Sequence, residues 1–424
     1  MKRFVINGGK PLYGEVNISG SKNAAVAIVA ATALVNDVCV LENIPDVSDV
    51  KILLDVLTTI GAKCSRDGDV VTIDSRSIDT WVADQDSISK MRGSSYLMGA
   101  LLGRFNHALV YLPGGCSIGP RPIDQHLKGF NGLGAVTKTE LGKVECSAPN
   151  GLVGNNIYLD IVSVGATINI ILAACMAAGN TVIENCAMEP HVVDLANFLN
   201  MCGANIRGAG TNTIRIKGVE ALHGCTYSII PDQIEAGTFM VAAAATHGEV
   251  TVRNVIPKHQ EALTAKLEEI NVGVEEGPDW IRIYDKGKLT HTNIKTAVYP
   301  GFPTDMQPQF VTLLTCAEGE SNVTETIWSS RFSYTSDLNR MGASIKATER
   351  SVTIYGCNGL AGIGMKAPDL RAGAAFVIAA LAAKGTSVIT GINYIDRGYY
   401  NFEGKLRDLG ADIRREDVDD EEEY

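Results

Sequence analysis

The chain has 424 residues, of which 46% are hydrophobic and 20% charged, and its formal net charge is -11. The length favours two or three domains, and we take two as the starting expectation. The composition excludes a disordered chain, and the negative charge argues against a general nucleic-acid binder, which needs a basic surface. Any anionic ligand must therefore meet a local group of basic residues.

Targeting and redox features predict a cytoplasmic protein. Residues 1–14 have a basic pair but neither the apolar run nor the cleavage site of a signal peptide. The longest apolar stretches, 24–35 and 374–383, are shorter than the roughly 20 residues that cross a bilayer. The ten cysteines show no metal-ligand spacing, so we expect reduced thiols, no bound metal and no membrane partner.

In chain order, two short strands at 3–6 and 15–18 precede a pattern that is repeated six times. Each repeat has an apolar helix, a β-rich segment, a second helix that ends at a Gly-Ala or Gly-Val pair, and a further strand. The apolar helices are predicted at 24–34, 95–102, 167–178, 237–246, 310–316 and 373–383. The β-rich segments are predicted at 38–41, 108–112, 181–184, 249–252, 322–326 and 387–390. The amphipathic helices are clearest at 47–60, 191–202, 261–271 and 401–409.

The glycine pairs recur at intervals of roughly 70 residues, longer than those of solenoid arrays. They are Gly61-Ala62, Gly134-Ala135, Gly203-Ala204, Gly273-Val274, Gly342-Ala343 and Gly410-Ala411. We expect each glycine to take the left-handed conformation that closes a helix.

Six repeats predict two similar domains of three repeats each. The first spans residues 22–229, and the second combines residues 1–21 with 230–424, so that the chain crosses between them twice. We expect the two N-terminal strands to complete the sixth repeat, which lacks a trailing pair of strands. Residues 417–424 carry a run of acidic side chains and are interpreted as a solvated tail. A cleft between two such domains is a common place for a substrate site.

Polar residues gather at the starts of the apolar helices. They are Lys22 and Asn23, Arg92, Ser163 with Val164 and Gly165, Asp232 with Glu235, Asp305, and Arg371. Helix N-termini present free N–H groups and the positive end of the dipole, which suits phosphate or carboxylate ligands. The alternative is ordinary helix capping, which is as probable for any one of these positions but much less so for all six.

Residues 113–126 form a second distinctive segment, with three glycines and three prolines that exclude regular structure. Cys116 lies within it, upstream of Arg121 and His126, and cationic neighbours could lower the pKa of its thiol and make it reactive. The alternative is an inert loop cysteine, and spacing alone favours that reading.

Several segments together resemble the UDP-N-acetylglucosamine 1-carboxyvinyltransferases of the enolpyruvyl transferase family. They are SGSKNA at 19–24, GGC at 114–116 with RPID at 121–124, SVGAT at 163–167, FPTDMQ at 302–307, DLR at 369–371 and IDRG at 395–398. The resemblance extends over essentially the whole chain. It implies an α/β fold, a two-domain inverse α/β barrel of six βαβαββ-type units, with no cofactor and no metal.

The resemblance implies transfer of the carboxyvinyl group of phosphoenolpyruvate to the 3′-hydroxyl of UDP-N-acetylglucosamine, the first committed step of peptidoglycan synthesis. Phosphoenolpyruvate is expected at Lys22, Asn23, Arg121, Arg331, Arg371 and Arg397. UDP-N-acetylglucosamine is expected at Asn23, Arg92, Arg121, Pro122, Ile123, Asp124, Gln125, Ser163, Val164, Gly165, Asp305 and Ile327. Arginine suits the donor independently of the resemblance, because its guanidinium group matches both carboxylate and phosphate.

Two proton transfers accompany such a reaction. Asp305 is the candidate base that orients the sugar hydroxyl, and Cys116, on a loop expected to be mobile, is the candidate acid for C3 of the donor. Lys22 and Arg397 complete the expected catalytic set, and Cys116 is also the expected site of a covalent adduct and of attack by fosfomycin. We expect the two small-molecule substrates as the only partners of a monomer or weak homo-oligomer.

Three positions depart from the pattern of the resembled family. Gln233 stands where arginine is usual, Met188 where a basic residue is common, and His191 where an acidic residue is frequent. None of them removes a proposed catalytic group. They would suit a second paralogue in one cell. Two alternatives stay open: a shikimate-pathway enolpyruvyl transferase, and a catalytically silent homologue with a regulatory role.

Overall fold

The computed structural model describes residues 2–83, 95–111, 122–140, 142–356 and 359–417. Two compact units result from the contacts within the chain: residues 20–230, the central unit, and residues 1–19 with 231–424, the terminal unit. Three predicted site residues, Arg92, Cys116 and Arg121, lie outside the described residues. Within the described ranges, none of the helices is long and apolar enough to span a membrane.

The central unit contains three sheets of four strands and six α-helices within its described residues. Its helices are α1 (Lys22–Ala31), α2 (Ser48–Thr59), α4 (Tyr96–Phe105), α5 (Asp124–Gly132), α6 (Val164–Ala174) and α7 (Pro190–Met201). Its strands are β3 (Val38–Glu42), β4 (Lys63–Asp67), β5 (Val70–Asp74), β6 (Val82–Ala83), β7 (His107–Tyr111), β8 (Val136–Glu140), β9 (Lys143–Ser147), β10 (Asn156–Tyr158), β11 (Asn180–Glu184), β12 (Asn205–Arg207), β13 (Thr213–Lys217) and β14 (Thr226–Ser228). The sheet orders are β14-β3-β5-β4, β6-β7-β9-β8 and β10-β11-β13-β12.

The terminal unit repeats this plan. Its α-helices are α8 (Gln233–Ala245), α9 (Glu261–Glu269), α10 (Gln307–Leu314), α11 (Thr335–Arg340), α12 (Leu370–Ala382) and α13 (Phe402–Asp408), and its 3-10 helices are η2 (Pro257–His259), η3 (Thr304–Met306) and η4 (Ile392–Arg397). Its strands are β1 (Lys2–Asn7), β2 (Tyr13–Asn17), β15 (Glu249–Arg253), β16 (Gly273–Glu276), β17 (Trp280–Tyr284), β18 (Asn293–Lys295), β19 (Glu320–Thr324), β20 (Ser344–Ala347), β21 (Ser351–Tyr355), β22 (Gly364–Lys366), β23 (Thr386–Thr390) and β24 (Asp412–Asp417). The sheet orders are β22-β23-β1-β24, β16-β17-β15-β2 and β18-β19-β21-β20.

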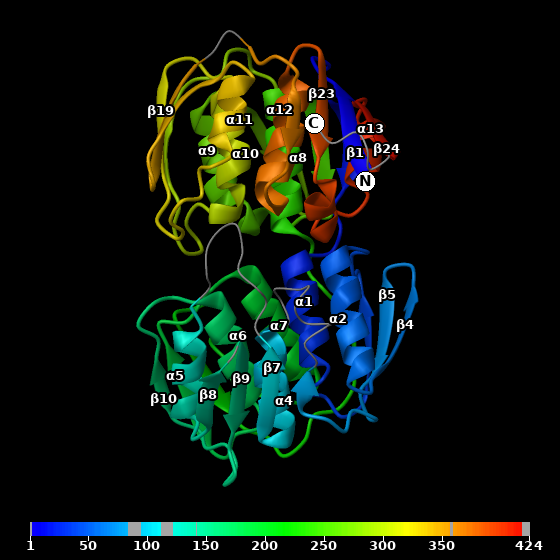
Figure 1. Cartoon of the computed structure of the whole chain (residues 1–424), viewed down its shortest axis with the longest axis vertical. Helices are drawn as coiled ribbons and strands as arrows, with labels where there is room; N and C mark the ends of the chain where they lie inside the picture. The colour runs from blue at the N-terminus through cyan, green and yellow to red at the C-terminus, as the bar shows by residue number, and fades with distance from the viewer. Residues whose placement is uncertain (1, 84–94, 112–121, 141, 357–358, 418–424) are drawn as a thin grey trace. The chain divides into compact units, whose positions relative to one another are not determined.

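The apolar helix of each repeat lies in the interior of its unit. In α6 every residue from Ala166 to Ala174 is buried, and in α12 every residue from Arg371 to Leu381. Helices with apolar residues all round can only be stable when they are covered on all sides. In Figure 1 the helices α8 to α12 lie between β19 at one edge and β1 and β24 at the other. The six predicted apolar helices are thus confirmed, and they pack inside the sheets.

The strand pair at the N-terminus is divided between two sheets. β1 lies between β23 and β24 and is antiparallel to both, with Phe4 opposite Ile389 and Arg415. β2 instead runs parallel to β15 in another sheet. β1 thus completes the sheet of the sixth repeat, whereas β2 is the parallel edge strand of the sheet of the fourth repeat.

Five of the six predicted glycine C-caps are confirmed. Gly61, for example, has φ +110° and Gly410 has φ +94°. Gly273 is the exception: it lies inside β16, and the left-handed residue after α9 is Asn271, with φ +71°. Asparagine tolerates the left-handed region better than other residues with a side chain, so it replaces glycine at this position.

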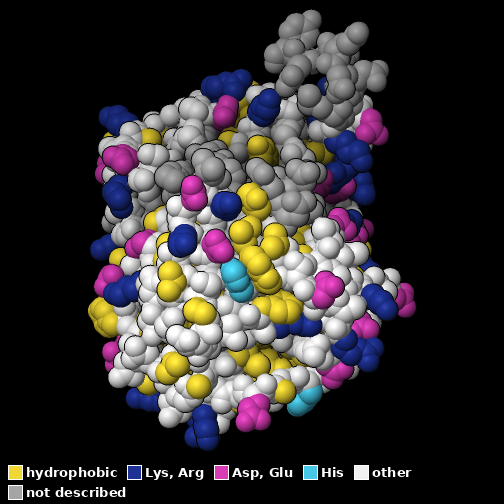
Figure 2. Space-filling model, turned by 60° about the horizontal axis from the view of Figure 1, so that its bottom comes forward, with side chains coloured by type: hydrophobic (Ala, Val, Ile, Leu, Met, Phe, Trp, Pro, Cys, Tyr) yellow, Lys and Arg dark blue, Asp and Glu magenta, His cyan; other side chains and the backbone are white. Residues whose placement is uncertain are grey.

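Acidic and basic side chains are interspersed around a band of hydrophobic side chains on the face shown in Figure 2. The positive charge on this face is thus divided among separate residues. Because the net charge is -11, binding of a small anion requires a local group of basic side chains.

Asp194 on α7 holds the last residues of the central unit in place through hydrogen bonds. Its carboxylate accepts hydrogen bonds from the Tyr227 hydroxyl (2.6 Å) and the Ile230 N–H (3.2 Å). The Ile230 carbonyl in turn accepts from the N–H of Ser21, the N-cap of α1 (2.7 Å). Asp194 is 2% exposed, and burial raises its pKa to about 6 in spite of these hydrogen bonds.

Replacing Asp194 with asparagine should therefore change how stability depends on pH. A raised pKa in the folded state gives stability at low pH that is lost as the pH rises from about 4 to about 6. Relative to Asp194→Asn, the wild-type protein should lose about 2 kcal/mol of unfolding free energy between pH 4.5 and 7.5. Urea denaturation of both proteins across this range measures the difference, and a difference independent of pH would show that Asp194 titrates normally.

Candidate active site

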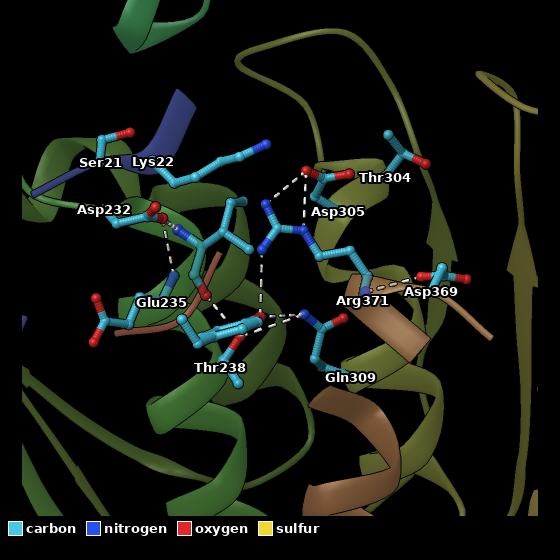
Figure 3. A network of polar contacts seen from close by, with 12 residues as sticks. Ser21, Lys22, Asp232, Glu235, Thr238, Thr304, Asp305, Gln309, Asp369 and Arg371 are labelled. Atoms are coloured by element: carbon cyan, nitrogen blue, oxygen red, sulfur yellow. Dashed lines mark hydrogen bonds and ion pairs between the residues drawn. The ribbon is translucent and has the colours of Figure 1, made fainter. Parts of the chain in front are cut away.

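Asp305 joins two buried arginines of the terminal unit. It lies in η3, directly before the interior helix α10. Its Oδ1 accepts a hydrogen bond from Arg331 Nη2 (3.0 Å), and its Oδ2 accepts from Nε and Nη2 of Arg371 (3.2 and 3.0 Å). Figure 3 shows the carboxylate of Asp305 facing the guanidinium group of Arg371. We call these three residues the Asp305 cluster.

The two arginines of the Asp305 cluster determine the pKa of its carboxylate. Both arginine side chains are 6% exposed, whereas that of Asp305 is 33% exposed. Burial alone would raise the pKa of Asp305, but the two guanidinium groups outweigh burial and hold that pKa well below its usual range. The cluster as described thus has two positive groups, one negative group and a carboxylate that accepts protons poorly.

Arg371 is held from its other sides as well. Asp369, the N-cap of α12, accepts from the Arg371 N–H (2.8 Å), and Arg371 Nη1 donates to the Tyr399 hydroxyl (3.4 Å). That hydroxyl also contacts Thr238 (2.9 Å) and Gln309 (3.4 Å), which Figure 3 shows on neighbouring helices. These contacts fix the guanidinium group before any substrate arrives.

Arg397 lies at the end of η4, which packs closely on the first turns of α12. A Cβ at Gly373 would meet Ile395 at 2.8 Å, and one at Gly398 would meet Leu370 at 2.8 Å. These two glycines let the backbones approach, so that Arg397 is carried beside the helix that carries Arg371. The fold thus brings the segments of Asp305, Arg331, Arg371 and Arg397 together in one unit.

Ile327, a predicted sugar-nucleotide residue, lies between β19 and Arg331. Its side chain is among the exposed large hydrophobic ones, at 38%, and its N–H donates to the buried carboxylate of Glu325 (2.9 Å). Because its backbone is fixed by this hydrogen bond, the exposed side chain of Ile327 can serve as an apolar contact for a ligand.

Lys22 of the central unit forms an ion pair with a buried carboxylate. Its Nζ lies 2.9 Å from Oδ2 of Asp49 in the first turn of α2, and the side chain of Asp49 is 1% exposed. Asp49 therefore orients the ammonium group. Asp49 could not be predicted from the sequence, since an acidic residue in the first turn of a helix is ordinary.

The other predicted residues of the central unit lie at helix starts. Asn23 is in the first turn of α1, and Ser163 is the N-cap of α6, where its Oγ accepts from the Ala166 N–H (3.3 Å). A Cβ at Gly165 would meet the His126 ring at 2.7 Å, so glycine lets α5 approach α6. Pro122 and Ile123 precede α5, and Asp124 begins it.

Gln125 has a structural role in the central unit. Its Nε2 donates to the carboxylates of Asp124 (2.8 Å) and Asp160 (3.2 Å), and its Oε1 accepts from the Asp160 N–H (2.9 Å). These bonds tie α5 to the segment that leads into α6. Its expected contact with the sugar nucleotide stays a prediction.

Ordinary capping accounts for part of the pattern at the helix starts. Asp232 Oδ1 accepts from the N–H groups of Ile234 (2.7 Å) and Glu235 (3.0 Å) and so caps α8. Glu235 is paired with Lys405 and accepts from the Ser19 N–H (3.1 Å). Both acidic residues are thus structural in this state.

The three departures lie in structural positions. Gln233 begins α8, and its carbonyl accepts from Gln260 Nε2 (2.7 Å). Met188 precedes α7, and His191 is buried within that helix.

The fold and these residues match a known group of enzymes. Residues 6–406 match the family model for EPSP synthase (3-phosphoshikimate 1-carboxyvinyltransferase). The chain therefore belongs to this family, that of the enolpyruvyl transferases. Among its relatives, the UDP-N-acetylglucosamine 1-carboxyvinyltransferase of Clostridium botulinum is 55% identical over 98% of this chain and 100% of its own. UDP-N-acetylglucosamine 1-carboxyvinyltransferase 2 of Clostridium acetobutylicum is 54% identical over 99% and 100%, and that of Bacillus subtilis is 51% identical over 100% and 98%.

Solved structures agree on the architecture. The enolpyruvyl transferase NikO from Streptomyces tendae superimposes with a TM-score of 0.89 at 27% identity, over 98% of both chains. EPSP synthase from Acinetobacter baumannii gives a TM-score of 0.75 at 20% identity, over 98% of this chain and 100% of that one, which bears on the fold alone. The expected enolpyruvyl transferase fold is confirmed.

Proposed function

We propose that this chain transfers the carboxyvinyl group of phosphoenolpyruvate to the 3′-hydroxyl of UDP-N-acetylglucosamine and releases phosphate, which begins peptidoglycan synthesis. The observation that carries the proposal is the Asp305 cluster, which combines a candidate base with two fixed cations, in a chain more than half identical to relatives named for this reaction. Those relatives favour the sugar-nucleotide acceptor over the shikimate-pathway acceptor.

The donor fits the cationic side chains of the terminal unit. Phosphoenolpyruvate carries a phosphate and a carboxylate on a small frame, and guanidinium groups bind both anions in bidentate fashion. Arg331 and Arg371 are already oriented by Asp305, and Arg397 lies on an adjoining element. Lys22, oriented by Asp49, and Arg121 complete the set that we assign to the donor.

The chemistry requires that one proton leaves the sugar hydroxyl and that another reaches C3 of the donor. The hydroxyl oxygen bonds to C2 while C3 gains its proton; C3 then loses a proton as the C2–O bond to phosphate breaks. We assign the first acceptor role to Asp305 and the donor role at C3 to Cys116. In these roles Asp305 would contact the sugar hydroxyl and Cys116 would contact C3 of the donor.

The pairing within the Asp305 cluster suggests how the base is activated. While both guanidinium groups contact the carboxylate, its pKa is held low and it is a poor base. The phosphate and carboxylate of the donor compete for the same guanidinium groups. Loss of this compensation raises the pKa of Asp305, so the base becomes competent when the donor is bound.

We place the reaction in the cytoplasm. The eight cysteines among the described residues are all free, although several are close to one another. This state is typical of a reducing compartment. The two small molecules are the partners that the proposal requires.

Replacing Arg397 with alanine should weaken donor binding more than acceptor binding. Loss of one charge-assisted contact costs roughly 1.5–3 kcal/mol, or roughly 10- to 100-fold in affinity. The exposed Arg414 of β24 offers a matched control, since Arg414→Ala should change neither affinity. Calorimetric titration of each protein with both substrates gives the comparison, and equal losses for both ligands would mean that Arg397 acts on the conformation instead.

The choice of acceptor can be tested separately. The wild-type protein should bind UDP-N-acetylglucosamine and should not bind shikimate 3-phosphate in parallel titrations. The reverse preference would reject the proposed acceptor while keeping the proposed donor.

A further inference from the structure

Glu325 is a buried carboxylate that the mechanism above does not use. It follows β19 directly and is 0% exposed. Its Oε1 accepts from the Thr296 hydroxyl (2.8 Å) and from the N–H groups of Ile327 (2.9 Å) and Trp328 (3.3 Å), and its Oε2 accepts from the Thr304 hydroxyl (2.8 Å). All four groups donate, which is the pattern that an ionised carboxylate accepts.

Thr304 connects this carboxylate to Arg331. The Thr304 hydroxyl has one hydrogen, which it donates to Glu325, and its oxygen accepts from Arg331 Nη1 at 2.6 Å. Because the hydrogen is committed to Glu325, an oxygen lone pair faces the guanidinium group. Arg331 is thus held at Nη1 by Thr304 and at Nη2 by Asp305.

Glu325 also fixes the backbone that leads to Arg331. Its bonds to the N–H groups of Ile327 and Trp328 hold the turn after β19, and the Thr326 hydroxyl donates to the Thr296 carbonyl (2.7 Å) beside it. One carboxylate therefore fixes both the η3 segment, through Thr304, and the turn that ends at Arg331. Donor binding that draws Arg331 Nη2 away from Asp305 would leave the contact between Arg331 Nη1 and Thr304 in place.

We propose that Glu325 is a positioning residue for this reaction: through Thr304 it holds Arg331 in place for the anionic donor while Asp305 is released. Glu325 touches no substrate in this scheme. The inference rests on the proposed function, because it concerns how well the donor is held during turnover.

A matched pair of substitutions at Thr304 tests the connection. Thr304→Val keeps the shape but removes the hydroxyl, whereas Thr304→Ser keeps the hydroxyl. We expect Thr304→Val and Glu325→Gln to raise the KM for phosphoenolpyruvate about tenfold or more, with the KM for the sugar nucleotide changed less than about threefold. Thr304→Ser should stay within about threefold of wild type. Thr296→Val removes another hydroxyl from the same carboxylate without touching Arg331, so it should leave the donor KM near that of wild type.

The double variant gives a readout that a merely structural role would not produce. If Thr304 and Glu325 act through one connection, Thr304→Val with Glu325→Gln should be no worse for the donor KM than the more severe single variant. Independent, multiplying effects would overturn the proposal, as would a Thr304→Val protein with an unchanged donor KM, or equal changes for all four single variants. Thr304→Val decides the matter even where Glu325→Gln lowers stability.

The wild-type protein separates this inference from the proposed function. Phosphate release by wild type with UDP-N-acetylglucosamine tests the function, and the ratios between variants test the position of Arg331. If wild type uses another acceptor, the proposed function fails and the same donor KM ratios, measured with that acceptor, still decide the role of Glu325.

Discussion

Replacing Asp305 with alanine is expected to lower turnover by about 10²- to 10⁴-fold, since a positioned base contributes that much to rate. Binding of UDP-N-acetylglucosamine should survive. Donor binding should be kept or strengthened, because Arg331 and Arg371 lose the carboxylate that competes with the donor. Steady-state phosphate release gives the rate, and calorimetric titration gives both affinities.

Stability distinguishes this result from simple unfolding. The Asp305→Ala protein leaves two buried guanidinium groups without their shared carboxylate, so its Tm should fall while the chain still folds, at a cost of up to about 3 kcal/mol. Asp305→Asn keeps the shape and one acceptor oxygen and should lose less stability, yet nearly as much turnover. Near-normal phosphate release from either variant would reject Asp305 as the base.

Replacing Cys116 with serine should abolish covalent labelling by an anionic epoxide such as fosfomycin. Cys116 precedes Arg121 and His126 in the sequence, and cationic neighbours would favour its reactive thiolate form. The Cys146, Cys175 and Cys186 thiols should compete poorly, because burial raises the pKa of the first two to about 12 and that of Cys186 to about 11. Intact-mass spectrometry over time should show one adduct on wild type and none on Cys116→Ser.

Substrates should change the rate of that labelling in opposite directions. A ligand favours the conformation that it contacts best. UDP-N-acetylglucosamine should therefore speed alkylation if it favours the state in which the loop of residues 113–126 is closed over the active site. Phosphoenolpyruvate should slow it by occupying the same cationic groups. The expected role of the loop fails if the sugar nucleotide protects the thiol, and the assignment of Cys116 fails if the serine variant is labelled at an unchanged rate.

Local chemistry made most of the fold predictable. The interior helices were apolar all round, and glycine is the usual residue where a helix ends in the left-handed conformation. The fourth repeat differed because Asn271 serves that role while Gly273 lies in β16. The division of β1 and β2 between two sheets could not be predicted, since strand partners depend on contacts between distant parts of the chain.

The candidate site residues could be selected from sequence motifs, but the electrostatic environment of each could not. The motif around Asp305 indicated a base, but its low pKa follows from Arg331 and Arg371, which are distant in sequence. Asp49 and Glu325 could not be predicted as functional, because single acidic residues at a helix start or a strand end are common. Their roles become visible only once the fold brings them to Lys22 and Thr304.

Phosphate release coupled to identification of the product tests the central claim most directly. The wild-type protein should release phosphate only when phosphoenolpyruvate and UDP-N-acetylglucosamine are both present. Mass spectrometry should then find one equivalent of a sugar nucleotide that carries a carboxyvinyl group in place of a hydroxyl hydrogen. Phosphate release with shikimate 3-phosphate in place of the sugar nucleotide, or no release with either acceptor, would contradict the account.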